Sequence, residues 1–287
     1  MGGAGYTSLR QLDRLSDRIR LHKQVDSRQV AIVEGATDER ILARAFGKEK
    51  IVYFQAGTRS LALDAAKQLV GWGKDYFVCI VDRDFDDEVG REKEENPHLH
   101  PYENADLEAM LAVSRVGVDL IAELGSEGKI AARGGIPEII AKLYEMVQPI
   151  ATLRRANMEN GWGLAFDKVD LVAKIDKKNM LLKVQSYCAA LSDASEGSPG
   201  QAVLIEYANG ARTVSAPSSC PRGSTPFFRG RDFLAILCAA LCGYCGSKRP
   251  QAVDPESLAE SLRLAGADYL RTSRWGKDLL SIIHLSE

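Results

Sequence analysis

The sequence has 287 residues, with 37 lysines and arginines against 39 aspartates and glutamates, a net charge of −2 and a pI of about 6.2. This balance excludes binding to nucleic acid through the overall charge, so any nucleic-acid surface must be a local patch. No apolar run approaches the roughly 20 residues of a membrane helix, and the N-terminus lacks the layout of a signal peptide. We therefore expect a cytoplasmic protein without a membrane partner, folded as one large domain or two.

The first predicted elements are a helix, a strand and a helix. Residues 8–24 have one apolar stripe, and the arginines between could contact phosphate but more simply make a solvated polar face. An apolar strand over 29–35 follows and ends in Glu34 and Gly35. Thr37 is a candidate N-cap for the next helix, which runs to Phe46.

The next elements complete a β-α-β-α-β order. A second strand covers 51–54, and Gly57-Thr58 opens a helix that runs to about Val70. The third strand, 76–82, is an unbroken apolar run that ends in a carboxylate, which is typical of a strand buried on both faces of a parallel sheet. The order predicts an α/β fold with a parallel sheet flanked by helices.

The remainder of the chain is mainly helical by pattern. The charged stretch 86–95 is too polar to pack and predicts a loop, and residues 102–111 predict a short helix. An Asn209-Gly210 pair between two apolar runs predicts a possible hairpin near 202–216. We expect two regions, 1–115 and 116–287. Further helices are expected at 118–124, 137–146, 178–191, 232–245, 254–270 and 276–284.

Six cysteines admit two interpretations. Cys79 lies in the third strand and is most simply a small buried apolar residue. Cys220, Cys238, Cys242 and Cys245 could together bind zinc. Three of these four lie in or next to an apolar helical stretch, and matched Cys-x-x-Cys pairs are absent, so a place in the core is the favoured interpretation.

Carboxylates follow two of the predicted strands. Asp82 and Asp84 are two residues apart, so in an extended chain both would point toward one cation. Glu34 ends a neighbouring strand, and Asp38 is near enough to join it. The carboxyl ends of parallel strands are where such sheets bind ligands, and oxygen ligands suit Mg²⁺. A solvated acidic turn is the simpler alternative.

These motifs resemble the Toprim superfamily. The residues that carry the resemblance are Val33-Glu34-Gly35 and Ile80-Val81-Asp82-Arg83-Asp84, 48 residues apart from Glu34 to Asp82. The form Val-Glu-Gly-x-x-Asp at 33–38, with Asn104-Ala105-Asp106-Leu107-Glu108, is closer to an OLD-like branch that includes the Toprim nuclease effector of the PARIS anti-phage defence system. The specific match covers about residues 29–115, with weak fragments at 153–166 and 230–237.

The resemblance implies a Toprim (Rossmann-like) fold and a nuclease site. Glu34 would bind metal or act as general acid and base, and Asp82 and Asp84 would hold Mg²⁺ or Mn²⁺. Asp38, Asp106 and Glu108 would complete a second metal site, although the last two could instead complement a helix dipole. Two divalent ions can neutralise both reacting oxygens of a phosphodiester.

The resemblance also implies substrate and partners. The favoured function is that of an anti-phage defence effector, an endoribonuclease that cleaves tRNA and is controlled by an ABC-type ATPase. The resemblance also implies a homodimer. An OLD-like DNA nuclease is the alternative, and a non-catalytic cation-binding scaffold is a hypothesis from a different class.

A few basic residues are candidates for contact with the nucleic acid. OLD-like nucleases carry a basic residue that stabilises the transition state, and no position here matches it clearly. Arg83 should point to the opposite side of its strand from the aspartates. The aromatic-rich stretch 227–231 is typical of single-strand binders or of a loop fixed by its aromatic residues. The candidates are Arg133, Arg154, Arg155, Arg229 and Arg231.

Overall fold

The computed structural model describes residues 14–215, 226–249 and 252–285. Its chain forms two compact units. Of the described residues, the first unit comprises 14–82, 88–102 and 267–285, and the second comprises 83–87, 103–215, 226–249 and 252–266. Over the described ranges, no helix is both long enough and apolar enough to cross a membrane.

A parallel sheet forms the centre of the first unit. Its strands are β1 (Gln29–Val33), β2 (Ile51–Gln55) and β3 (Phe77–Ile80), in the order β2-β1-β3. Residues 98–102 continue the sheet beyond β3, because Cys79 N–H donates to the His98 carbonyl and Cys79 accepts from His100 N–H, each at 2.8 Å. The predicted parallel α/β sheet is confirmed.

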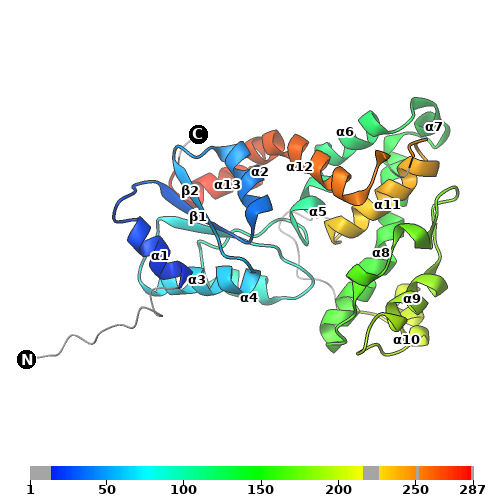
Figure 1. Ribbon diagram of the computed structural model, residues 1–287, viewed down its shortest axis with the longest axis horizontal. Coiled ribbons are helices and arrows are strands. Elements are labelled where there is room, and N and C mark those ends of the chain that lie inside the picture. The colour runs from blue at the N-terminus through cyan, green and yellow to red at the C-terminus, as the bar shows by residue number, and fades with distance from the viewer. Residues whose placement is uncertain (1–13, 216–225, 250–251, 286–287) are drawn as a thin grey trace, which may run out of the picture. The chain divides into compact units, whose positions relative to one another are not determined.

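Burial explains why these stretches form strands. All four residues of β3 and the last four of β1 are buried, so both faces of the central strands need apolar cover. Helices α1 (Leu15–His22), α3 (Arg59–Gly71) and α4 (Glu88–Glu95) pack on one face. Helices α2 (Ala36–Phe46) and α13 (Arg274–Ile282) contact the sheet from the other face (Figure 1).

Two predictions about this unit need correction. Helix α2 is capped by Gly35 and not by Thr37, because the Asp38 side chain in its first turn reaches back and accepts the Gly35 N–H. The charged stretch 86–95 contains helix α4 and is not simply a loop, because Val89 is buried in the core while the charged residues face outward. Thr58 caps α3 as expected from its place after Gly57, accepting the Leu61 N–H.

The second unit is mainly helical, and the mainly helical character predicted for the C-terminal region is confirmed. Its longest helix, α8 (Ile136–Asn160), continues past Pro149 and packs against α10 (Gln201–Ala208) and α11 (Gly230–Gly243). The other elements are α5 (Leu107–Ala112), α6 (Arg115–Leu124), α7 (Glu127–Ala132), the strand pair β4 (Ile175–Asp176) and β5 (Leu181–Leu182), and α9 (Val184–Asp193). Helix α12 (Pro255–Thr272) contains the boundary at which the chain returns to the first unit.

The hairpin predicted near 202–216 is wrong over its first arm. Residues 201–208 form α10, with Leu204 and Ala208 buried one turn apart. Asn209-Gly210 ends this helix: Gly210 has a φ of 75°, Gly210 N–H donates to the Tyr207 carbonyl, and Ala211 N–H donates to the Glu206 carbonyl at 2.8 Å. These two bonds are those of a Schellman C-cap, in which glycine satisfies the last carbonyls of a helix.

The described cysteines favour the core interpretation. Cys79, Cys188, Cys238 and Cys245 are buried free thiols, and burial raises the pKa of Cys238 and of Cys245 to about 11. Cys242 is half-buried. Cys220, the fourth ligand of the zinc interpretation, lies outside the described residues.

Candidate functional site

Two predicted site residues follow adjacent strands of the first unit. Glu34 comes directly after β1 and Asp82 shortly after β3, and the register pairs Val33 with Ile80. The Glu34 Oε1 atom accepts the backbone N–H of Asp82 at 2.8 Å. Both side chains are half-buried. The fold therefore brings together two carboxylate-bearing residues that are 48 positions apart in the sequence.

Asp38 is held in the first turn of α2 by two donors. Its Oδ2 accepts the Gly35 N–H at 3.2 Å, and its Oδ1 accepts the Tyr102 hydroxyl at 2.8 Å. Tyr102 is buried and stacks on Trp275 of α13, with ring centroids 5.4 Å apart. The Trp275 indole N–H donates to the Pro101 carbonyl at 3.0 Å. The orientation of Asp38 thus depends on the neighbouring Gly35 and on residues from two distant parts of the sequence, 101–102 and Trp275.

Asp84, Asp106 and Glu108 belong to the second unit. Asp84 has a φ of 51°, and its N–H donates to the Ala105 carbonyl at 2.9 Å. The chain is therefore not extended at Asp84, so the extended backbone from which the sequence argument started is wrong at this residue.

Asp106 and Glu108 have contacts of a structural kind. The buried Asp106 is the N-cap of α5: it accepts the Ala109 N–H at 2.8 Å and the Gly230 N–H at 2.9 Å. Burial, reinforced by the charge of Glu108, raises the pKa of Asp106 to about 7, while the two N–H donors oppose the shift. Glu108 pairs with Arg263 at 2.5 Å. These contacts favour the alternative in which Asp106 and Glu108 stabilise the N-terminus of a helix, here α5, and do not bind metal.

The predicted basic residues are largely engaged within the second unit. Arg154 is buried and binds both oxygens of Asp232, at 2.5 and 2.8 Å. Arg155 is buried as well and pairs with Asp87 at 3.1 Å. The Arg154–Asp232 pair is buried on both sides, so removing one partner would leave an uncompensated buried charge, whereas Asp87 is 47% exposed. We therefore no longer propose Arg154 and Arg155 for contact with nucleic acid.

The other three candidates are more exposed. Arg133 lies over the ring of Tyr244, 4.3 Å from its centroid. Arg231 pairs with Asp167 at 3.2 Å, and Arg229 lies 3.9 Å from the same carboxylate. Phe228 beside them is fully buried and stacks on Phe233. The stretch 227–231 is thus anchored by an aromatic residue, as the second of its two interpretations predicted.

The donor chemistry suits a hard divalent cation, but the geometry supplies few ligands. In residues 14–215, 226–249 and 252–285, no three His, Cys, Asp or Glu side chains gather in a metal-binding group. Mg²⁺ needs no such cage, since it is commonly bound by one or two carboxylates together with waters and substrate phosphates. Glu34 and Asp82 fit that mode of binding by residue type and by their position at the carboxyl edge of the sheet.

No sequence pattern marks Tyr102 or Trp275 as residues that position Asp38, because their contacts span 64 and 174 residues. No model of a known protein family matches the sequence, and a search of curated proteins finds no significant match.

Proposed function

We propose that this chain is a metal-dependent phosphodiester endonuclease of the Toprim type, whose reaction centre contains Glu34, Asp38 and Asp82. The observation that carries the proposal is the bond from the Asp82 N–H to the Glu34 carboxylate, which fixes two carboxylate-bearing residues at the ends of adjacent parallel strands. The resemblance of residues 33–38 and 80–84 to Toprim motifs supports it. Asp84 stays a predicted ligand on the strength of that resemblance alone.

Each residue has a chemical task in this proposal. Glu34 takes the proton of the attacking water as general base, so that the water oxygen can bond to phosphorus as the leaving P–O bond breaks. Tyr102 and Gly35 hold Asp38 by hydrogen bonds to separate oxygens, which fixes its orientation. A Mg²⁺ or Mn²⁺ ion held by these carboxylates would stabilise negative charge on the reacting oxygens.

The substrate and partners follow from the resemblance to the OLD-like branch. We propose RNA, with tRNA favoured, as the substrate of a defence effector that an ABC-type ATPase controls and that acts as a homodimer. DNA is the second candidate substrate. A cation-binding scaffold without catalysis remains the hypothesis from a different class, and the test below separates it from both nucleases.

The test uses purified wild-type protein, Glu34→Gln and an Asp119→Ala control, each incubated with tRNA and with plasmid DNA in Mg²⁺ or Mn²⁺. Glu34→Gln keeps an oxygen that can accept the Asp82 N–H and removes the basic carboxylate. We expect it to lower cleavage about 10²–10⁴-fold, the range for loss of a general base. Asp119 is 61% exposed on α6, so its variant should cleave like wild type.

The outcomes distinguish the candidates. Cleavage of tRNA that depends on Glu34 supports the ribonuclease, and Glu34-dependent cleavage of DNA alone supports the OLD-like alternative. If neither polymer is cut in either metal, also with the triggered ATPase partner present, the nuclease proposal fails. Cleavage that is equal in wild type and Glu34→Gln would reject Glu34 as the base.

A further inference from the structure

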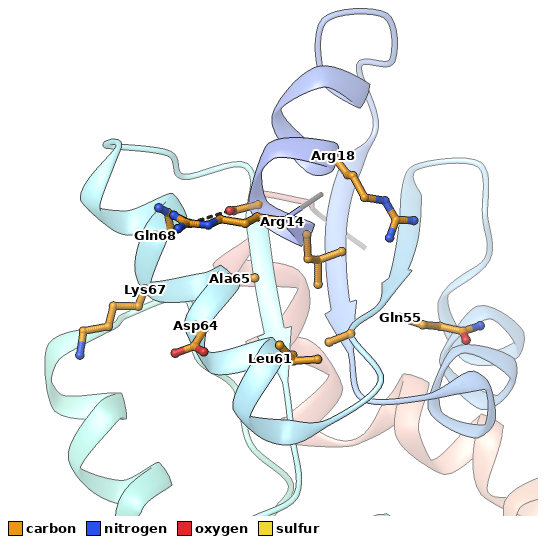
Figure 2. A pocket seen from close by; sticks show the side chains of 11 residues that line it. Arg14, Arg18, Gln55, Leu61, Asp64, Ala65, Lys67 and Gln68 are labelled. Carbon is orange, nitrogen blue, oxygen red and sulfur yellow. Dashed lines mark hydrogen bonds between the residues drawn. The ribbon is translucent and has the colours of Figure 1, made fainter. Parts of the chain in front are cut away.

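The first unit contains a cavity that none of the predicted site residues lines. Its volume is about 740 Å³, and it lies between α1, α3 and the end of β2 (Figure 2). Ligand-binding pockets commonly have volumes of about 300–1,000 Å³. The cavity is therefore large enough for a nucleotide-sized group.

Positive charge dominates the polar part of the lining. Three cationic residues line the cavity, Arg14 and Arg18 from α1 and its start and Lys67 from α3, against a single carboxylate, Asp64. The side chains of Arg14 and Arg18 make no ion pair or hydrogen bond with any residue in the described ranges. Lys67 is 67% exposed and lies 3.7 Å from Glu92. Two guanidinium groups one helical turn apart are thus uncompensated within the described structure.

The remainder of the lining combines apolar residues with the uncharged polar residues Ser16, Gln55 and Gln68. Leu15, Ala56, Leu61 and Ala65 contribute to the cavity, and Leu61 is 53% exposed, so its side chain is accessible to a ligand. A basic wall beside an apolar floor matches the two parts of a nucleotide: the phosphate is anionic, while the face of a base is apolar and can lie on aliphatic side chains.

The cavity adjoins the strand that carries Glu34. Gln55 and Ala56 form its wall at the end of β2. Ala56 N–H donates to the Val33 carbonyl and Gly57 N–H donates to the Glu34 carbonyl, each at 2.8 Å. The lining residue Ala56 is thus bonded to Val33, the neighbour of the residue proposed as general base, at the carboxyl edge of one sheet.

We infer that this cavity binds a single-stranded segment of the nucleic-acid substrate, with phosphates on Arg14, Arg18 and Lys67 and a base against Leu61. The inference rests on the proposed function and adds to it a subsite beside the reaction centre. Guanidinium groups match phosphate geometry through paired N–H donors. This subsite also explains how a protein with a net charge of −2 could hold a polyanion: the positive charge is local.

The test measures binding separately from cleavage. A labelled single-stranded RNA of about ten nucleotides, within the usual site size, is titrated in EDTA with the Glu34→Gln protein. The same titration is made with Arg14→Ala/Arg18→Ala added and, as a matched control, with Arg115→Ala/Arg271→Ala. The control arginines are 86% and 60% exposed and do not line the cavity.

We expect the cavity double variant to weaken binding at least about tenfold and to reduce the slope of log affinity against log salt by about 1.4, from about 0.7 per lost phosphate contact on a single strand. The control should retain both values. Equal losses in the two double variants, or none in either, would overturn the inference. Inorganic phosphate or a mononucleotide that binds as tightly as the RNA would also overturn it, since the site would then serve a small anion.

Failure of the two proposals can be told apart. If the cavity variant binds RNA normally while Glu34→Gln abolishes cleavage, only the subsite is rejected. If RNA binds through the cavity and wild-type protein cuts no nucleic acid, only the nuclease is rejected, and the chain is a binding module.

Discussion

His98 illustrates how a single side chain can make stability depend on pH. Its ring lies 4.8 Å from that of Phe77, and its Nδ1 atom is buried without a hydrogen-bond partner among the described residues. Burial lowers the pKa of His98 from its ordinary value of 6.5. Below pH 6.5 the unfolded chain therefore binds a proton more readily than the folded chain, so stability falls as the pH falls through that value.

We predict that His98→Gln flattens this acid-side loss of stability. Urea unfolding at a series of pH values between about 7 and 5 spans the ordinary pKa of histidine. The variant should lose less stability than wild type over that interval. Asp119→Ala serves as the control, because Asp119 is 61% exposed on α6 and is not among the groups that shift the pKa of His98. Parallel curves for wild type and His98→Gln would contradict the prediction.

At the same scale, the sequence located some site residues and missed others for a physical reason. Glu34 and Asp82 could be placed because each terminates a local apolar run, and such a run indicates a strand end without any tertiary information. The partners of Arg154 and Asp106 could not be placed, since these bonds join residues 78 and 124 positions apart. As long as its partner is unknown, an arginine that is buried in an ion pair cannot be distinguished in the sequence from an arginine that contacts phosphate.

Among the elements, α5 and α11 of the second unit approach closely at Gly230. A Cβ atom on Gly230 would lie 2.6 Å from the Ala109 nitrogen and closer still to Glu108 Cβ. The φ of this glycine is not in the left-handed region, so the requirement for glycine is one of space. The close approach allows the Gly230 N–H to reach Asp106.

We therefore predict that Gly230→Ala destabilises the second unit by about 1–3 kcal/mol, the usual cost of overpacking. Gly128→Ala is the matched control: it lies in α7 with nothing within 4 Å of the added atom. That variant should be neutral or stabilised by about 0.5–1 kcal/mol, because alanine favours a helix over glycine. Thermal unfolding of both variants tests the predicted difference in stability, and equal midpoint temperatures would contradict it.

Helices α4 and α10 show where local patterns mislead. In α4 a single buried residue, Val89, anchors a helix of charged residues that are good helix formers. In α10 the apolar run at 203–205 favours a strand by composition, but burial follows the spacing of Leu204 and Ala208, and Gly210 supplies a helix cap. Asn-Gly indicates a hairpin strongly only when strands flank it. Here the preceding residues form a helix, because tertiary packing overrides their preference for a strand.

On the scale of the whole molecule, the first unit is assembled from both ends of the chain. Helix α13 is more than 170 residues from the strands it covers, yet Trp275 is buried against His100 and Tyr102. Tyr102 in turn holds Asp38. Composition and periodicity predicted α13 as a helix, but they could not show that it completes the sheet domain.

We predict that Trp275→Ala destabilises the first unit by about 3–5 kcal/mol, as expected when a large buried aromatic side chain is removed. Hydrogen exchange followed by peptide should show lost protection in β1 and in residues 98–102, while peptides from α8 serve as an internal control. Trp275→Phe retains most of the stacking and loses the bond to Pro101, so its loss should be smaller. Arg274→Ala, an exposed neighbour on α13, should leave exchange unchanged. Loss of protection confined to α8 would show that α13 supports the second unit instead. The assignment of α13 to the first unit would then be wrong.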